Sequence, residues 1–279
     1  MSNMLAKWVI EDFEPDNKFG ALADECRRQG CDVEVIRYTP FQAGSYDIFG
    51  ENDCVIFQGS INLAQQLQRD KHWIPGPWLT AKNYECTRYY AHLGKYLFNW
   101  EYIMLPRADV PRKLDWIFDK CFVREELFFR PSSGLKPWTA GVYSKHNVSS
   151  LWRWVEEFTD PDNIVVISTP KIIDGEWRFV CAEGKVITGC QYERDGKLFF
   201  QTGYDPKAKE LADTIAAEEY KPDPMYIVDI CLSNGNYYLM EINSFSCGGL
   251  YALDLVPIVE TANRLAFKEW KEYQRCTTI

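Results

Sequence analysis

The stretch MYIVDICLSNGNYYLMEINSFSCGGLYALD, residues 225–254, decides the predicted fold of this chain. Two apolar runs, Met225 to Leu232 and Tyr237 to Ile242, flank a Ser-Asn-Gly-Asn segment that is typical of a turn between strands rich in β-branched and aromatic residues. The pattern therefore predicts an antiparallel hairpin that carries three oxygen-bearing side chains, Asp229, Glu241 and Asn243.

The length of the turn decides whether these side chains meet. Side chains alternate between the two faces of a strand, so Glu241 and Asn243 share a face. A two-residue Asn-Gly turn would put Asp229 on the opposite face, whereas a three-residue loop, Asn234 to Asn236, would place it directly across from Glu241. We favour the three-residue loop, because a carboxylate inside an apolar strand needs a partner. Two carboxylates and an amide oxygen at one point suit Mg²⁺; the alternative is an ordinary hairpin with one exposed carboxylate.

Small residues follow the hairpin, from Ser244 to Gly249. The apolar spacing after them predicts a helix that continues to about Tyr273. A glycine-rich helix start would present backbone N–H groups to an anion beside the metal, and a plain strand-to-helix turn is the alternative. Tyr251 and Asp254 lie one helical turn apart just past the glycines, where they would contact the acceptor substrate or only cap and pack that helix.

The spacing Asp-x11-Glu-x-Asn, on a hairpin that ends in a small-residue loop, resembles the metal-binding end of the ATP-grasp superfamily. The likeness is greatest to small phage- and bacterium-associated ATP-grasp proteins of uncertain substrate, which are carboxylate–amine ligase-like. Residues 128–141, FFRPSSGLKPWTAG, resemble the strand and flexible loop whose basic residues hold the nucleotide phosphates. The likeness covers roughly residues 120 to 260.

Two further stretches resemble the same superfamily in the right order. Residues 164–171, IVVISTPK, resemble the hinge strand whose backbone meets the adenine edge, and the hinge ends in Ser168, Thr169, Pro170 and Lys171. Residues 174–180, DGEWRFV, resemble the next strand, where the carboxylate of Glu176 meets the ribose and Arg178 faces the phosphates or the substrate.

The resemblance implies an α/β fold made of α+β lobes, with ATP and Mg²⁺ as cofactors. It divides the chain into a small N-terminal α/β lobe at 1–110, a central lobe at 111–168 and a C-terminal metal-binding lobe with the Mg-ATP site at 169–279. The implied metal ligands are Asp229, Glu241 and Asn243.

Basic residues must gather locally to hold a nucleoside triphosphate, because this chain has 40 acidic and 31 basic residues. The candidates are Arg130, Lys136, Lys171 and Arg178. Pro131 cannot continue a strand interior, so Arg130 is predicted at a strand end, ahead of a mobile Ser-Ser-Gly loop. The alternatives are a solvated loop pair for Arg130 and Lys136, and surface positions for the other two.

One position departs from the superfamily pattern. Many ATP-grasp ligases carry an arginine two residues before the first metal carboxylate, and Ile227 stands there in this chain. Either Arg178 supplies that positive charge from the neighbouring strand, which we favour, or the acceptor chemistry differs. Arg178 and Lys136 are therefore the predicted catalytic cations.

Composition agrees with a globular enzyme of two or three lobes, since 279 residues exceed the usual single-domain length and 46% of them are apolar. No apolar run approaches the roughly 18 residues of a membrane helix, and Met1-Ser2-Asn3 begins no signal peptide, so we expect a cytoplasmic protein without a membrane partner. Ten scattered cysteines favour reduced thiols, with Cys247 as an apolar filler. A net charge of −9 makes nucleic acid an unlikely partner.

Elsewhere the patterns predict the remaining elements. Strands at Met4–Ile10, Asp32–Arg37 and Cys54–Phe57, alternating with helices at Asn17–Gln29 and from Ser60 through Arg69, predict a mainly parallel sheet. The later predictions are a loop at Pro75–Pro77, helices near 81–93, 113–118, 149–158 and 206–219, and strands near 121–129, 139–144, 176–192 and 197–202.

Together these features predict a Mg-ATP-dependent ligase. It would phosphorylate a carboxylate to an acyl phosphate, which an amine would displace to form an amide, and it would release ADP and phosphate. The predicted partner is a small molecule or peptide, most simply an amino acid or peptide. Two alternatives remain, an ATP-dependent kinase on the same scaffold and a non-catalytic nucleotide-binding or interaction protein.

Overall fold

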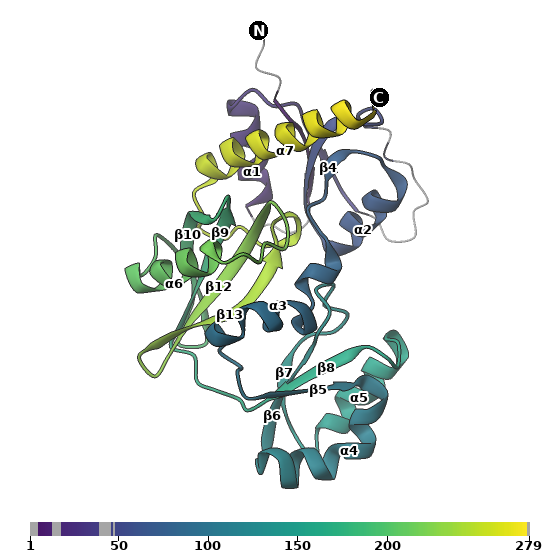
Figure 1. Ribbon diagram of the computed structural model, residues 1–279, viewed down its shortest axis with the longest axis vertical. Coiled ribbons are helices and arrows are strands. Elements are labelled where there is room, and N and C mark those ends of the chain that lie inside the picture. Colours follow the sequence, from purple (N-terminus) through teal and green to yellow (C-terminus); the bar gives the residue numbers. More distant parts are fainter. Residues whose placement is uncertain (1–4, 13–17, 39–45, 47, 278–279) are drawn as a thin grey trace.

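The computed structural model describes residues 5–12, 18–38, 46 and 48–277 of the chain. Three sheets follow one another along the long axis of the molecule (Figure 1). Their strand orders are β2-β1-β3-β4, β5-β8-β6-β7 and β11-β10-β9-β12-β13. This confirms the predicted α/β fold made of lobes.

The N-terminal sheet is parallel, as predicted. It contains β1 (Lys7–Glu11), β2 (Val33–Ile36), β3 (Cys54–Gln58) and β4 (Ile74–Gly76), with α1 (Phe19–Arg28) and α2 (Ile61–Asp70) between them. Ser60 caps α2 through its hydroxyl, which accepts from the N–H of Leu63 at 3.3 Å. Two predicted element starts, Met4 and Asn17, lie outside the described residues.

The loop predicted at Pro75–Pro77 is wrong in part, because β4 forms there as a three-residue edge strand beside β3. An edge position tolerates proline, which cannot donate to a ladder on both sides. After β4 the chain forms a short 3₁₀ helix, η2 (Ala81–Tyr84), and then α3 (Cys86–Leu93), followed by the 3₁₀ turn η3 (Gly94–Tyr96).

The central sheet is antiparallel and lies at the far end of the molecule from both termini (Figure 1). Its strands are β5 (Tyr102–Pro106), β6 (Glu126–Pro131), β7 (Gly141–Ser144) and β8 (Ile164–Ser168), and its helices are η4 (Arg107–Asp109), α4 (Val110–Trp116), the π-helical turn η5 (Ile117–Phe122) and α5 (Val148–Phe158). The strand predicted near 121–129 begins only at Glu126, since the preceding helix extends to Phe122. Strand β5, which precedes residue 111, pairs with β8 and was not predicted.

The C-terminal sheet is also antiparallel and lies between the other two (Figure 1). It contains β9 (Gly175–Ala182), β10 (Lys185–Arg194), β11 (Lys197–Thr202), β12 (Met225–Ser233) and β13 (Asn236–Ser244), with α6 (Pro206–Ala217) before the hairpin. The predicted strand 176–192 is two strands joined at a turn. The final helix, α7 (Leu255–Thr277), packs against β3, β4 and α1 of the N-terminal lobe.

The two faces of the C-terminal sheet have different roles. One face buries Trp177, Phe179, Val228 and Ile230 in a hydrophobic core that also includes residues of α3 and α6. The opposite face packs Val180, Ala182, Met225 and Ile227 against the N-terminal sheet. The polar residues described below lie on this second face. No helix in the described part of the chain is both long enough and apolar enough to cross a membrane.

Candidate active site

The β12–β13 hairpin places Asp229 directly opposite Glu241, as predicted, but by a different route. The turn has two residues, because Ser233 pairs with Asn236, so the predicted three-residue loop is wrong. The register then shifts between the pairs Ile230–Leu239 and Asp229–Glu241, which makes Met240 the extra residue of a β-bulge. The bulge turns both Met240 and Glu241 toward the same cavity.

Asp229 is fully buried and paired with Arg178 on the neighbouring strand β9. The guanidinium donates through Nε to Oδ1 at 2.9 Å and through Nη2 to Oδ2 at 2.7 Å, and through Nη1 to the carbonyl of Gly249 at 2.9 Å. Burial raises the pKa of Asp229, and the charge of Arg178 opposes that rise. The bidentate geometry fixes the orientation of both groups.

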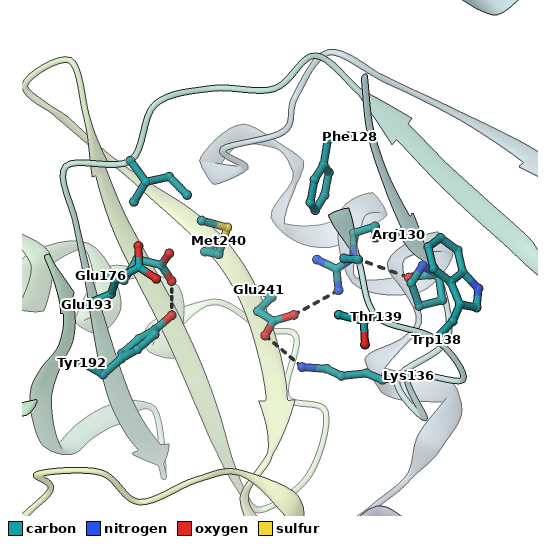
Figure 2. Close-up of a pocket in the computed structure, with 13 residues that line it drawn as sticks. Phe128, Arg130, Lys136, Trp138, Thr139, Glu176, Tyr192, Glu193, Met240 and Glu241 are labelled. Carbon is teal, nitrogen blue, oxygen red and sulfur yellow. Dashed lines mark hydrogen bonds and ion pairs between the residues drawn. The ribbon is translucent and has the colours of Figure 1, made fainter. Parts of the chain in front are cut away.

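Glu241 meets two cations from the central lobe (Figure 2). Arg130, at the end of β6 as predicted, donates to Oε2 at 3.1 Å, and Lys136 donates to Oε1 at 3.0 Å. Although burial alone raises it, these two charges hold the pKa of Glu241 well below its usual range. The two lobes therefore meet at this carboxylate.

The residues present fit a divalent cation with a preference for oxygen ligands. Asn243 Nδ2 lies 2.9 Å from Asp229 Oδ2 and 2.9 Å from Glu241 Oε1, so both carboxylates converge on one amide. Turning that amide about its last bond would bring its oxygen to the same point, which completes a hard-ligand set suited to Mg²⁺. The described residues hold no cluster of three or more His, Cys, Asp or Glu side chains that suits a metal, so the candidate site rests on two carboxylates and one amide.

The phosphate loop is held at its base. The carbonyl of Ser132 accepts from the N–H of Cys86 at 2.9 Å, and its hydroxyl accepts from the N–H of Thr87 at 3.2 Å. Gly134 lies so close to η2 that a Cβ there would be 2.4 Å from the Cβ of Tyr84. These contacts hold the loop so that Lys136 reaches Glu241, which the sequence-based expectation of a mobile loop did not include.

A cavity of about 590 Å³ opens beside Glu241. Arg130, Lys136 and Glu176 line it together with apolar side chains of both lobes, and the remaining residues are Phe128, Pro131, Trp138, Thr139, Ala140, Ile173, Tyr192, Glu193, Met240 and Glu241 (Figure 2). Glu176 accepts a short hydrogen bond from the hydroxyl of Tyr192. Burial raises the pKa of Glu176 to about 8, the Tyr192 hydrogen bond lowers it, and neighbouring carboxylates raise it further.

The predicted hinge residues do not line this cavity. Ser168 is buried and its hydroxyl has no hydrogen-bond partner in the described structure. The hydroxyl of Thr169 donates to Glu101 at 3.2 Å, Pro170 follows it, and Lys171 Nζ donates to the Thr169 hydroxyl at 3.3 Å while lying over the ring of Phe98. Lys171 is thus brought to the hinge itself and not to the cluster at Glu241.

The segment after the hairpin differs from the prediction. A 3₁₀ turn, η6 (Phe245–Cys247), follows β13, and α7 begins only at Leu255, so the glycines do not start the long helix. Asp254 is exposed and accepts from the N–H of Val256 at 3.1 Å, a capping contact. Tyr251 lies over the guanidinium of Arg178, 4.7 Å from ring centroid to Cζ.

Sequence reasoning missed two residues of this site, Met240 and Tyr192. Tyr192 is the extra residue of a second bulge, since its neighbours pair as Gln191–Trp177 and Glu193–Glu176. No local pattern marks either bulge, because both residues are ordinary strand formers in apolar surroundings. The position left without an arginine, Ile227, is fully buried, and its Cδ1 lies where a Cβ on Gly248 would stand.

The fold matches known ATP-grasp structures. D-Cycloserine synthetase DcsG superposes with a TM-score of 0.62 at 13% identity, over 94% of this chain and 100% of that one. D-alanine–D-alanine ligase from Bacillus anthracis gives a TM-score of 0.59 at 15% identity, over 97% and 100% of the two chains. The ATP-grasp ligase PsnB, complexed with a minimal precursor, gives 0.56 at 10% identity, over 93% and 99%.

At these identities the likeness shows a shared fold. No curated protein matches the chain by sequence. A family model described as an ATP-grasp domain, the second family of its clade, matches residues 119–260, about half of the chain, and this range includes the hairpin, the phosphate loop and the hinge. The protein therefore belongs to this family of ATP-grasp domains.

Proposed function

We propose that this protein is a Mg-ATP-dependent carboxylate–amine ligase that forms an amide or peptide bond through an acyl phosphate and releases ADP and phosphate. The observation that carries the proposal is the convergence of two carboxylates and three cations from two lobes at Glu241 and Asp229. Such a site can hold a metal and several phosphate charges together.

Each residue of the cluster has a role in this proposal. Asp229, Glu241 and Asn243 hold the metal, which when bound bridges phosphate oxygens and lowers repulsion as a carboxylate attacks. Arg130 and Lys136 hold phosphate oxygens once they are released from Glu241, and Lys136 stabilises charge on the transferred group. Arg178 supplies the positive charge that Ile227 cannot provide, since it is fixed beside Asp229 by three hydrogen bonds.

The nucleotide lies in the 590 Å³ cavity in this proposal, with its base near the hinge of Ser168, Thr169, Pro170 and Lys171 and its ribose near Glu176. The apolar side chains of Phe128, Ile173 and Met240 suit a planar base there. The phosphate end then points toward Lys136, on the far side of the cavity from Glu176 (Figure 2).

A second cavity of about 510 Å³ supports ligation over simple nucleotide binding. It is lined by Lys136 and Gly249 on one side and by the start of α2 on the other, so Lys136 separates it from the first cavity. It opens beside the carboxyl ends of the parallel strands, where α/β sheets commonly bind ligands. We place the acid substrate, an amino acid or a short peptide, in this cavity.

Acid-dependent ADP release from Mg-ATP tests the proposal. The wild type should release ADP with some members of a panel of amino acids, short peptides and cell extract, and mass spectrometry should detect a product whose mass equals acid plus amine less one water. A stable phosphorylated product would instead identify a kinase. ATP binding without any ADP release across the panel and the extract would contradict catalysis and favour a binding protein.

A further inference from the structure

Tyr192 lies at the junction of two parts of the site that no strand ladder joins. It is the bulge residue of β10, and a bulge re-aims one side chain out of the regular alternation. Its hydroxyl donates to Oε2 of Glu176, and its ring centroid lies 5.3 Å from Cζ of Arg178. One side chain thus contacts both the carboxylate in the nucleotide cavity and the cation beside the metal ligands.

The ring of Tyr192 is itself held in place. It stacks on Tyr251 with centroids 5.0 Å apart and planes 17° from parallel, and Tyr251 stacks on Phe200 at 5.2 Å and 15°. Arg178 lies against both tyrosine rings. Stacked rings of this kind resist rotation of any one member, so the hydroxyl of Tyr192 is fixed in direction.

Glu176 depends on this contact. Its side chain is only 8% exposed, and among the described residues Tyr192 supplies the one side-chain hydrogen bond that it accepts. A buried carboxylate without a fixed donor would turn toward solvent or bind a proton. Glu193, Asp229 and Glu241 all raise the pKa of Glu176, so neighbouring charge does not replace that donor.

We propose that Tyr192 is a positioning residue that holds Glu176 toward the sugar hydroxyls of the nucleotide and holds Arg178 toward the reacting phosphoryl group. The inference rests on the proposed function. It assigns the two links to different parts of one side chain: the hydroxyl orients Glu176, and the ring supports Arg178.

Nucleotide affinity tests the first link without any turnover. We compare dissociation constants for Mg-ATP and Mg-2′,3′-dideoxy-ATP by calorimetry in the wild type, Tyr192→Phe and Glu176→Gln. Tyr192→Phe should weaken ATP binding roughly tenfold and change dideoxy-ATP binding less than twofold, because only ATP offers hydroxyls to Glu176. The double variant should lose no more than Glu176→Gln alone, since the two groups act as one unit.

Tyr96→Phe is a matched control, because Tyr96 also donates its hydroxyl to a glutamate, Glu218, at 2.5 Å and lines neither cavity. It should bind both nucleotides like the wild type. Equal weakening of ATP and dideoxy-ATP in Tyr192→Phe, or unchanged ATP affinity with an unchanged melting temperature, would overturn the first link.

Turnover tests the second link by a split between kcat and KM. Tyr192→Phe keeps the ring, so KM for ATP should rise while kcat stays within twofold. Tyr192→Leu removes the ring beneath Arg178, so kcat should also fall roughly tenfold. Equal kcat in the Phe and Leu variants would overturn the second link. A wild type without acid-dependent ADP release would refute the proposed function and with it the second link, whereas the affinity comparison would still decide the first.

Discussion

Asp229 faces Glu241 across the β12–β13 hairpin only because Met240 is an extra residue in β13. The two-residue turn alone would place Asp229 opposite Met240 and would turn Glu241 toward the hydrophobic core that contains Leu239 and Ile242. The bulge therefore decides whether the two carboxylates form one site.

Replacing Glu241 by glutamine should lower Mg-dependent ADP release by roughly 100-fold or more, because the candidate metal loses a charged ligand. The fold should persist, since the glutamine oxygen can still accept from Arg130 and Lys136. Steady-state ADP release and a thermal melt measure the two effects. Glu219→Gln, on an exposed side chain, is the control. Turnover at the wild-type rate in Glu241→Gln would remove this residue from the site.

The buried pair of Arg178 and Asp229 should behave as a unit in unfolding. Arg178→Met leaves the carboxylate of Asp229, which is 0% exposed, without its guanidinium, and should cost about 3–5 kcal/mol in the free energy of unfolding. The double variant Arg178→Met/Asp229→Leu should recover most of that loss, because no buried charge then remains unpaired. Urea unfolding measures both. Additive losses in the double variant would contradict a coupled pair.

Stability should depend on pH through Glu176. Its pKa in the folded protein is about 8, above its ordinary value of 4.5, so the folded state binds the proton more tightly than the unfolded chain. The wild type should therefore lose stability relative to Glu176→Gln as pH rises from about 4.5 to about 8, with no further change above that range. Melting temperatures of both proteins across roughly pH 4 to 9.5 measure the difference. A constant difference would show that Glu176 ionises normally.

Lys136 should compete with the metal for Glu241 when no nucleotide is bound. Its ammonium lies 3.0 Å from Glu241 Oε1, so Lys136→Ala should bind Mn²⁺ more tightly than the wild type in the absence of ATP. The same variant should bind Mg-ATP more weakly, because a phosphate contact is lost. Since this side chain is 44% exposed, stability should change by less than about 1 kcal/mol. Mn²⁺ titration followed by paramagnetic resonance, with and without ATP, gives the two affinities; changes of the same sign would contradict the competition.

Gly134 should be required for the position of the phosphate loop. In Gly134→Ala the new Cβ would lie 2.4 Å from the Cβ of Tyr84, which would push the loop away from η2 and cost about 1–3 kcal/mol. ATP affinity should fall with it, since Lys136 lies two residues further on. Gly94→Ala is the matched control, because nothing lies within 4 Å of a Cβ there. Calorimetry and urea unfolding of both variants check the prediction; equal behaviour of the two would contradict it.

Much of the fold could be predicted from local sequence. The parallel N-terminal sheet follows from alternating apolar runs and helix caps such as Ser60, and the hairpin follows from Asn234-Gly235 between two apolar runs. Strand β5 was missed because its pairing partner, β8, lies almost 60 residues later in the chain, and the end of the helix before β6 was misplaced because a π-helical turn has no clear sequence signal.

The sequence by itself determined which residue types stand at the ligand positions and in what order the hairpin, phosphate loop and hinge occur, because strand and turn preferences are local properties of the chain. Only the tertiary structure decided that Met240 and Tyr192 form bulges, that Arg178 pairs with Asp229, and that Arg130 and Lys136 reach Glu241. These contacts join residues of different strands and lobes, whose relative positions are set by the packing of the sheets as a whole.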